Sequence, residues 1–183
     1  MKVLRTEIRG VMVVETAPVA DQRGAFARWF CEEELGAVME HRRTVQVNYS
    51  RTSRVGALRG LHYQRAPHAE MKLIRCIKGR VFDVAVDLRQ GSTTFLRWHA
   101  EELTPANGRM LVIPEGCAHG FQAMEPDSDL LYLHTASYAP DAEGGVRFDE
   151  SRIGVSWPMP LVDISERDRS FAVLDAGFSG IST

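Results

Sequence analysis

Short apolar runs separated by turn-forming residues limit most strongly what this chain can fold into. Gly, Pro, Asn and Asp interrupt it at close intervals, and the only good helix candidate, Glu32 to Glu40, is short. Regular short strands with turn signals favour an all-β sandwich or barrel over βαβ units. The strand candidates are Val11 to Glu15, Thr44 to Asn48, Lys72 to Ile77, Val81 to Leu88, Met110 to Ile113 and Leu130 to Leu133.

One β-hairpin can be built around Lys78-Gly79, a two-residue turn candidate with glycine second. Because side chains alternate between the faces of a strand, one face of this hairpin is apolar and the other carries Lys72 diagonal to Asp83 and Asp87. The polar face is either a solvated surface with one exposed ion pair or a barrel interior lined with chemistry, and the hairpin does not decide between them. The predicted register pairs Ile77 with Arg80, Ile74 with Asp83, and Lys72 with Ala85.

Composition and charge exclude several classes of protein. Of the 183 residues, 44% are hydrophobic and 25% are charged, and the net charge of -2 gives no basic excess for binding nucleic acid. No stretch approaches the roughly 20 apolar residues that cross a bilayer, and the first ten residues lack the pattern of a signal peptide. We therefore expect one domain in the cytoplasm, with neither a membrane nor a nucleic acid as partner.

The residue patterns of several metal and cofactor sites are missing. Three widely spaced cysteines without a CxxC pair predict neither a disulfide framework nor a zinc site. His62 is followed by Tyr63 and Gln64, so the closely spaced histidine pair of a metal-binding barrel is absent, although three distant ligands could still converge. No GxSxG, GxGxxG or P-loop motif occurs, which argues against a serine hydrolase, a dinucleotide site and an ATP site.

Taken one at a time, the residues best suited to chemistry have ordinary structural explanations. His62 and His119 lie in glycine-flanked apolar segments, where a histidine often packs and makes a single hydrogen bond. Asp168 lies in the charged stretch 164–169, which is typical of a surface, and Tyr132 lies in an apolar strand, as a core tyrosine would. The pattern alone therefore does not identify an active site.

Motifs spread along the chain are more specific than any single residue. The longer ones are Gly56-Ala-Leu-Arg-Gly-Leu-His-Tyr-Gln64, Val81-Phe-Asp-Val-Ala-Val-Asp-Leu-Arg89 and Ile113-Pro-Glu-Gly-Cys-Ala-His-Gly-Phe121. The shorter ones are Asp21-Gln-Arg-Gly24, Lys72-Leu-Ile-Arg75, Tyr138-Ala-Pro140, Ile153-Gly-Val-Ser-Trp-Pro158 and Ser165-Glu-Arg-Asp168. In this number and order they resemble the dTDP-4-dehydrorhamnose 3,5-epimerase family over nearly the whole chain.

The resemblance implies a fold and an assembly. The fold is all-β, a cupin-type jelly-roll β-barrel with short helices near the N-terminal third and the C-terminus, and the protein forms a homodimer. A single cupin-like epimerase domain would span 1–183, with N-terminal strands and a short helix in 1–50 that join the dimer. Residues 51–160 would form the barrel core and 161–183 the C-terminal segment that supplies Asp168. Neither a metal nor another cofactor is implied.

The resemblance also assigns four catalytic residues, whose types suit proton transfer beside a ketone. His62 would be the general base, since histidine titrates near neutrality, and Asp168 would orient it. Lys72 would stabilise the oxygen that gains charge in the enolate, and Tyr132 would return a proton from the opposite face. These four residues are all present, which speaks against an inactive relative.

A second set of residues would bind the substrate. Two arginines of the set suit a diphosphate, because their guanidinium groups form two parallel hydrogen bonds to it. The sequence departs from the family at Arg28, where a substrate-contacting Glu is usual, at Val47, a common Asp, and at Cys117, a usual Phe. The implied set is Arg23, Phe26, Arg28, Gln46, Asn48, Arg59, Asp83, His119, Tyr138, Glu143 and Arg167, of which Arg23 and Arg59 would hold the diphosphate.

The expected function is that of a nucleotide-sugar epimerase that inverts C3 and C5 of dTDP-4-dehydro-6-deoxy-D-glucose, towards dTDP-L-rhamnose or a related deoxysugar. Its partner would be a dTDP-sugar. The alternatives are epimerisation at C3 alone or C5 alone, or on another nucleotide 4-ketosugar. A non-catalytic sugar-binding cupin and a metal-dependent cupin isomerase or dioxygenase belong to different classes. The number of inverted carbons is open at this point.

Overall fold

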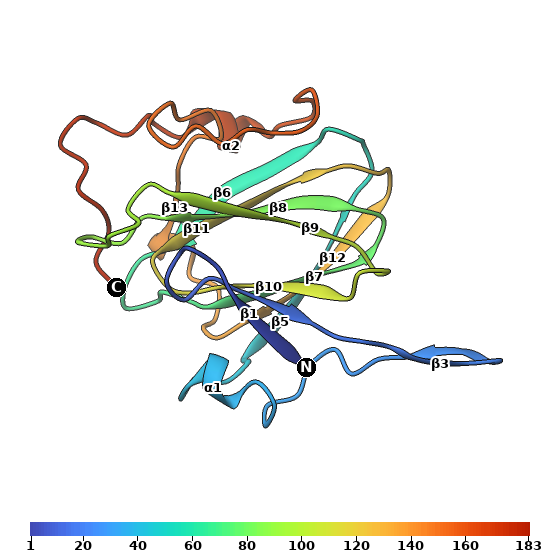
Figure 1. The fold of residues 1–183 in the computed structure, drawn as a ribbon. Helices are drawn as coiled ribbons and strands as arrows, with labels where there is room; N and C mark the ends of the chain where they lie inside the picture. The colour runs from blue at the N-terminus through green and yellow to red at the C-terminus, as the bar shows by residue number, and fades with distance from the viewer.

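Two antiparallel β-sheets face each other in the computed structural model, which describes residues 1–183 (Figure 1). The six-stranded sheet runs, in order, β1 (Lys2–Arg5), β2 (Met12–Glu15), β10 (Arg109–Ile113), β7 (Lys72–Lys78), β12 (Ser128–His134) and β5 (Gln46–Thr52). The five-stranded sheet runs β13 (Glu143–Gly145), β6 (Leu58–Gln64), β11 (Cys117–Ala123), β8 (Val81–Asp87) and β9 (Trp98–Leu103). Several strands that follow one another in the chain, such as β7 and β8 or β11 and β12, lie in opposite sheets, as in a jelly roll.

Short elements complete the fold. The strands β3 (Val19–Asp21) and β4 (Gly24–Phe26) form a hairpin that projects away from the sheets, as Figure 1 shows. The helices are α1 (Gly36–Met39), the 3₁₀ turn η1 (Pro140–Ala142) and α2 (Glu166–Ser170). The all-β prediction with short helices in the N-terminal third and at the C-terminus is confirmed. The hydrogen-bonded ladders form separate sheets, however, and do not close into one barrel.

Apolar residues are buried on both faces of the sheets, which explains why the strands are near-continuous apolar runs. Between the sheets lies a core that includes Ile74, Ala85 and Phe121. The outer face of the six-stranded sheet packs under the α1 region, and the outer face of the five-stranded sheet is covered by the C-terminal segment. No helix is long and apolar enough to cross a membrane.

The predicted hairpin around Lys78-Gly79 is wrong. Strand β7 pairs with β10 and β12, whereas β8 pairs with β9 and β11, so the chain crosses from one sheet to the other at this turn. The turn packs closely on Ser128, because a Cβ on Gly79 would lie 2.4 Å from the Ser128 hydroxyl oxygen. The predicted alternation still holds, since Ile74 and Ala85 both point into the core between the sheets.

The helix predicted over Glu32 to Glu40 is helical only from Gly36 to Met39. Its N-cap is Leu35, whose side chain makes no capping hydrogen bond, and its first residue is a glycine, which is costly in a helix. Two strands that the sequence patterns missed, β6 and β11, contain Gly60 and Gly120, residues that are depleted in strands.

Asp87, which the hairpin placed near Lys72, bonds elsewhere. Its carboxylate accepts hydrogen bonds from Arg89 Nε and Nη2 at 2.8 Å, and from the hydroxyls of Ser92 and Thr94 at 2.6 Å. Burial would raise the pKa of Asp87, but these hydrogen bonds outweigh it and lower the pKa from 3.8 to about 2. Asp87 therefore anchors the loop after β8 and is not part of a catalytic cluster.

Asp87→Asn is expected to lower the free energy of unfolding by about 2 kcal/mol at pH 7, the amount that corresponds to the lowered pKa. Because the folded-state pKa lies below the ordinary value, this contribution is complete above that value and falls as the pH drops towards about 2. Urea unfolding at pH 7 and pH 3 measures it, with about half of the difference left at pH 3. Asp149→Asn, which breaks an exposed pair with Arg147, is the control. An equal Asp87→Asn effect at both pH values contradicts the assignment.

Candidate active site

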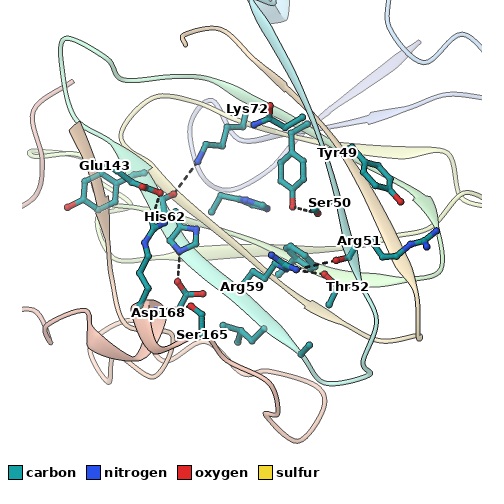
Figure 2. Close-up of a pocket in the computed structure, with 18 of the residues that line it drawn as sticks. Tyr49, Ser50, Arg51, Thr52, Arg59, His62, Lys72, Glu143, Ser165 and Asp168 are labelled. Atoms are coloured by element: carbon teal, nitrogen blue, oxygen red, sulfur yellow. Dashed lines mark hydrogen bonds and ion pairs between the residues drawn. The ribbon is translucent and has the colours of Figure 1, made fainter. Parts of the chain in front are cut away.

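A cavity of about 780 Å³ opens between the two sheets. One wall comes from β6 and β11 of the five-stranded sheet, the other from β5, β7 and β12 of the six-stranded sheet, and the segment before and within α2 closes one side (Figure 2). The predicted residues that line it are Asn48, Arg59, His62, Lys72, His119, Tyr132, Tyr138, Glu143, Arg167 and Asp168.

An irregularity in β6 brings two of these residues onto one face. Against β11, His62 lies opposite His119 and Arg59 lies opposite Phe121, so three steps on β6 match two on β11. Such an extra residue is a β-bulge, and it re-aims side chains. The strands approach so closely here that a Cβ on Gly60 would lie 2.5 Å from the Cα of Gly120. His62 and Arg59, which would otherwise point to opposite faces, both reach the cavity.

His62 and Asp168 form a hydrogen-bonded pair, with Nε2 2.7 Å from Oδ1 (Figure 2). The second carboxylate oxygen accepts the backbone N–H of Gly60 at 3.1 Å, and Asp168 is only 3% exposed. Burial would raise the pKa of Asp168, but the hydrogen bond and charge of His62 and the Gly60 N–H outweigh it and lower the pKa. The ionised carboxylate holds the proton on Nε2, which leaves Nδ1 as the basic nitrogen.

The short helix α2 explains why a charged stretch buries Asp168. Ser165 is its N-cap, and its hydroxyl accepts the backbone N–H of Asp168 at 3.0 Å. Phe171, directly after the helix, packs edge-on against the ring of His62 at 5.8 Å between centroids. Gly145 makes room for the Phe171 ring, because a Cβ on Gly145 would lie 2.2 Å from that ring. Phe171 was not predicted from the sequence, and its position three residues after Asp168 is the signal that could have indicated it.

Lys72 and Tyr132 face His62 from the opposite sheet. Lys72 is 9% exposed, and its Nζ donates to the backbone carbonyl of His62 at 3.4 Å. The Tyr132 hydroxyl lies 3.2 Å from the hydroxyl of Ser50. Burial raises the pKa of Tyr132, so the phenol keeps its proton at neutral pH. The polar face predicted for the Lys78-Gly79 hairpin, which carries Lys72 and Asp83, is thus an interior surface and not a solvated one.

A second histidine and carboxylate pair lies deeper between the sheets. His119 Nε2 donates to both oxygens of Asp83, at 2.9 and 3.1 Å, and Asp83 is fully buried. Burial raises the pKa of Asp83, against the opposing effect of His119. Asp83 therefore supports His119 from below the cavity. No group of three or more His, Cys, Asp or Glu side chains lies close enough together to hold a metal ion.

Polar residues surround the mouth of the cavity. Arg59 donates from Nε to the Thr52 hydroxyl at 3.1 Å and from Nη2 to the Arg51 carbonyl at 3.2 Å. Glu143 accepts from the Tyr138 hydroxyl at 2.8 Å and is ion-paired with Arg167. Next to them, Gln46 accepts the N–H of Tyr138 at 3.1 Å and donates to Asn48 Oδ1 at 3.1 Å.

Five predicted substrate-binding residues do not line this cavity. Asp83 lies beneath it and Gln46 beside its mouth, whereas the other three lie in or directly after the projecting hairpin. Arg23 and Phe26 belong to the projecting hairpin, where Phe26 is 75% exposed and Arg23 is paired only with Asp21. Arg28 follows the hairpin and forms an ion pair with Glu34. Within one chain these residues are not brought together with the rest of the site. The departure Val47 also points away from the cavity, since it is 56% exposed and is not part of the lining.

The lining also includes residues that were not predicted, among them a paired glutamate and histidine. Glu70 comes two residues before Lys72, and His134 comes two after Tyr132. Their side chains are bonded to each other, with His134 Nδ1 2.7 Å from Glu70 Oε2. The period of two along a strand places His134 on the same face as Tyr132, so alternation could have found it.

A histidine hydrogen-bonded to a carboxylate thus faces a protonated tyrosine and a lysine across a cavity between two sheets. These groups suit the class of jelly-roll enzymes that transfer protons. Comparison with known proteins identifies the family. The profile of the dTDP-4-dehydrorhamnose 3,5-epimerase family matches residues 5–176, and the chain belongs to this family of isomerases.

Individual relatives agree with the family. The protein named dTDP-4-dehydrorhamnose 3,5-epimerase from Salmonella typhimurium is 39% identical over 177 residues, which covers 96% of each chain. The Legionella pneumophila epimerase, solved in complex with dTDP-4-keto-L-rhamnose, has a TM-score of 0.91 at 33% identity and covers 100% of this chain and 98% of that one. A 3'-monoepimerase from Streptomyces bikiniensis, solved with dTDP-quinovose, has a TM-score of 0.85 at 32% identity, with coverages of 93% and 86%. The fold is therefore of the cupin type, as expected.

Proposed function

We propose that this protein inverts C3 and C5 of dTDP-4-dehydro-6-deoxy-D-glucose by forming and reprotonating an enolate, towards dTDP-L-rhamnose or a related deoxysugar. The observation that carries the proposal is the His62–Asp168 pair facing Lys72 and Tyr132 across one cavity, in a chain that belongs to this epimerase family. Hydrogens on the carbons beside the C4 ketone are acidic because their removal yields an enolate. The site supplies what that chemistry requires.

The residues divide the proton transfer between the two sheets. His62 Nδ1 removes the proton, and the ionised Asp168 stabilises the imidazolium that forms. The ammonium of Lys72 stabilises the negative charge on the C4 oxygen. Tyr132, on the opposite sheet and still protonated because burial raises its pKa, delivers a proton to the other face of the sugar. Inversion follows because removal and return occur from opposite sides.

The substrate's nucleotide end is assigned to the mouth of the cavity. Arg59 is held by Thr52 and by the Arg51 carbonyl, so that its guanidinium is fixed before a diphosphate arrives. We place Gln46 and Asn48 along the nucleotide and Tyr138, which is 54% exposed, against its base. His119, Glu143 and Arg167 are assigned to further substrate contacts.

Arg59→Lys is expected to weaken dTDP binding about tenfold, or about 1.4 kcal/mol, because lysine keeps the charge but loses the two-pronged hydrogen bonding. Calorimetric titration with dTDP measures the affinity. Arg80→Lys, in a surface pair with Glu125, is the matched control. Equal affinity for dTDP in wild type and Arg59→Lys contradicts the assignment of Arg59 to the diphosphate.

The number of inverted carbons is tested by incubation with dTDP-4-dehydro-6-deoxy-D-glucose in deuterated water. NMR is expected to show deuterium at both C3 and C5 and the doubly inverted product. The runner-up function, inversion at C3 alone, is favoured by the structural likeness to the Streptomyces bikiniensis 3'-monoepimerase. Exchange and inversion confined to C3 select it, and no exchange at either carbon refutes the epimerase proposal.

A symmetric homodimer is our proposal for the assembly, joined through the N-terminal residues 1–50. The projecting β3–β4 hairpin supports it, because its three residue pairs make no contact with this chain's own cavity and leave Phe26 exposed. In a dimer, Arg23, Phe26 and Arg28 of one copy would complete the site of the other. The chain is then one domain, with its barrel core in 51–160 and the segment 161–183 closing the site.

Light scattering at micromolar concentration tests the assembly, and a monomeric mass refutes the dimer. Mixing two inactive variants tests the sharing of residues between copies. If Arg23 acts in the partner's site, Arg23→Ala mixed with His62→Ala regains part of the activity, because one site of a mixed dimer has both residues intact. Failure to regain activity in dimers shown to exchange subunits overturns the shared site.

A further inference from the structure

Glu70 and His134 form a buried pair beside the proposed catalytic lysine. Glu70 Oε2 lies 2.7 Å from His134 Nδ1, and its other oxygen, Oε1, lies 3.3 Å from Lys72 Nζ. The side chains of Glu70 and His134 are 7% and 10% exposed. Lys72 and His134 are paired directly across β7 and β12, so their side chains lie next to each other on the cavity face. One carboxylate thus joins the two residues.

This arrangement leaves one donor of Lys72 for a ligand. An ammonium group has three N–H donors. Glu70 Oε1 accepts one at 3.3 Å, and the His62 carbonyl accepts another at 3.4 Å. These two contacts fix the direction of the third N–H donor, which is what a group that binds a single oxygen of the substrate requires.

The Glu70 carboxylate is itself held in place by His134. Asn48 Nδ2 lies 3.4 Å from His134 Nε2, and this amide donor fixes the tautomer in which His134 Nδ1 donates to Glu70. The His134 ring is also stacked on the ring of Tyr132, at 6.1 Å and 14° between planes. His134 therefore has little freedom to move, and neither has the oxygen that faces Lys72.

We propose that Glu70 and His134 are a positioning pair that aims the ammonium of Lys72 at the C4 oxygen while the enolate forms. The proposal rests on the function proposed above, in which Lys72 stabilises the C4 oxygen. Neither residue touches the reacting carbons. Their effect on the reaction passes through Lys72, and His134 acts by holding Glu70.

The charged groups around Lys72 support this assignment. From β8 it faces Asp83, from β11 His119, from β6 His62 and Arg59, and from β12 Tyr132 and His134. Burial raises the pKa of Asp83, and that carboxylate bonds to His119 and not to Lys72. Glu70 is different, because the hydrogen bond from His134 and the charge of Lys72 outweigh its burial and lower its pKa. Glu70 is thus the carboxylate that contacts the ammonium, and it is ionised at neutral pH.

Glu70→Gln is the first test, since glutamine keeps the shape and an oxygen acceptor but removes the negative charge. Without the carboxylate charge that holds Lys72 Nζ, the ammonium is misaligned with the C4 oxygen, so kcat is expected to fall about tenfold while KM changes little. Glu115→Gln, which removes a partly buried carboxylate paired with Arg42 outside the active-site cavity, is the control and leaves kcat and KM unchanged.

The surroundings of Lys72 can be observed directly, because the chain has only three lysines, Lys2, Lys72 and Lys78. With ¹³C-labelled lysine, Lys2→Arg and Lys78→Arg identify the Lys72 signal. Its chemical shift is expected to change in Glu70→Gln together with kcat, because the ammonium loses the carboxylate that holds it. A purely structural role for Glu70 leaves the Lys72 signal of the folded variant in place.

His134 is tested with two variants that differ in one hydrogen bond. His134→Ala removes the donor to Glu70 and is expected to lower kcat about tenfold while KM changes little, because the ammonium is misaligned. His134→Asn offers an amide N–H near the position of Nδ1 and is expected to restore most of kcat. If asparagine gives no more activity than alanine, with both variants folded, His134 does not act through Glu70.

The outcomes separate this inference from the function on which it rests. Wild-type protein without deuterium exchange or epimerisation refutes the proposed function. Active wild type combined with an unchanged kcat and an unchanged Lys72 signal in Glu70→Gln refutes the positioning pair alone. A Glu70→Gln protein that does not fold leaves the His134→Ala and His134→Asn comparison to decide.

Discussion

His62→Ala is expected to lower kcat roughly 10²–10⁴-fold and to abolish solvent-deuterium exchange at both C3 and C5. Without the imidazole no group in the cavity removes the proton, so no enolate forms. Asp168→Asn should lower kcat and exchange in the same way but to a smaller extent, because a neutral amide no longer stabilises the imidazolium or fixes the proton on Nε2. NMR of the reaction in deuterated water measures exchange and product in the same tube.

His41→Ala is the matched control for His62, because His41 is exposed and lies outside the cavity. Its exchange and turnover should equal those of wild type. Thermal unfolding checks that His62→Ala is folded, since His62 packs against Phe171. Near wild-type exchange in a folded His62→Ala protein means that His62 is not the base, and the proposed mechanism is then wrong at its centre.

Tyr132→Phe is expected to separate exchange from inversion. His62 and Lys72 remain, so the enolate still forms and some deuterium still enters the sugar. The hydroxyl that returns a proton to the opposite face is gone, so inverted product should fall roughly 10²-fold, most strongly at C5. Phenylalanine keeps the ring that stacks on His134, so the effect isolates the loss of the hydroxyl.

The ratio of exchange to inversion is the decisive measurement for Tyr132. A high ratio in Tyr132→Phe, with a normal ratio in wild type, identifies the tyrosine as the acid on the far face. Ser50→Ala is an informative companion, because Ser50 is the only hydrogen-bond partner of the Tyr132 hydroxyl. Equal losses of exchange and inversion in Tyr132→Phe rule out a simple role as the far-side acid.

The strand content could be predicted from the sequence because it depends on local alternation and turn residues. Runs such as Val81 to Leu88 correspond closely to strands, here β8 over Val81–Asp87. The pairing of strands could not be predicted in the same way. Lys78-Gly79 has the local form of a hairpin turn, yet it connects strands of different sheets, since β7 pairs with β10 and β12 whereas β8 pairs with β9 and β11.

The four proposed catalytic residues were predicted through the family resemblance, because the local sequence pattern gave each of them an ordinary structural explanation. For Asp168 the charged stretch 164–169 indicated a surface, whereas the Ser165 cap and the contact with His62 bury it. The pairing of Glu70 with His134 could not be predicted, because a hydrogen bond between positions 64 residues apart leaves no local trace in a sequence.

By itself the sequence determined the class of fold and, through its motifs, the residue types available for proton transfer. Alternation and turn chemistry act over a few residues, so they can be recognised without knowing where distant segments lie. Only the tertiary structure decided which strands face each other, which carboxylate is hydrogen-bonded to which histidine, and on which side of the cavity His62 lies. The β-bulge that turns Arg59 and His62 onto one face is an example, because it exists only where β6 meets β11. These relations depend on contacts between residues far apart in the chain, and such contacts form only when the two sheets pack.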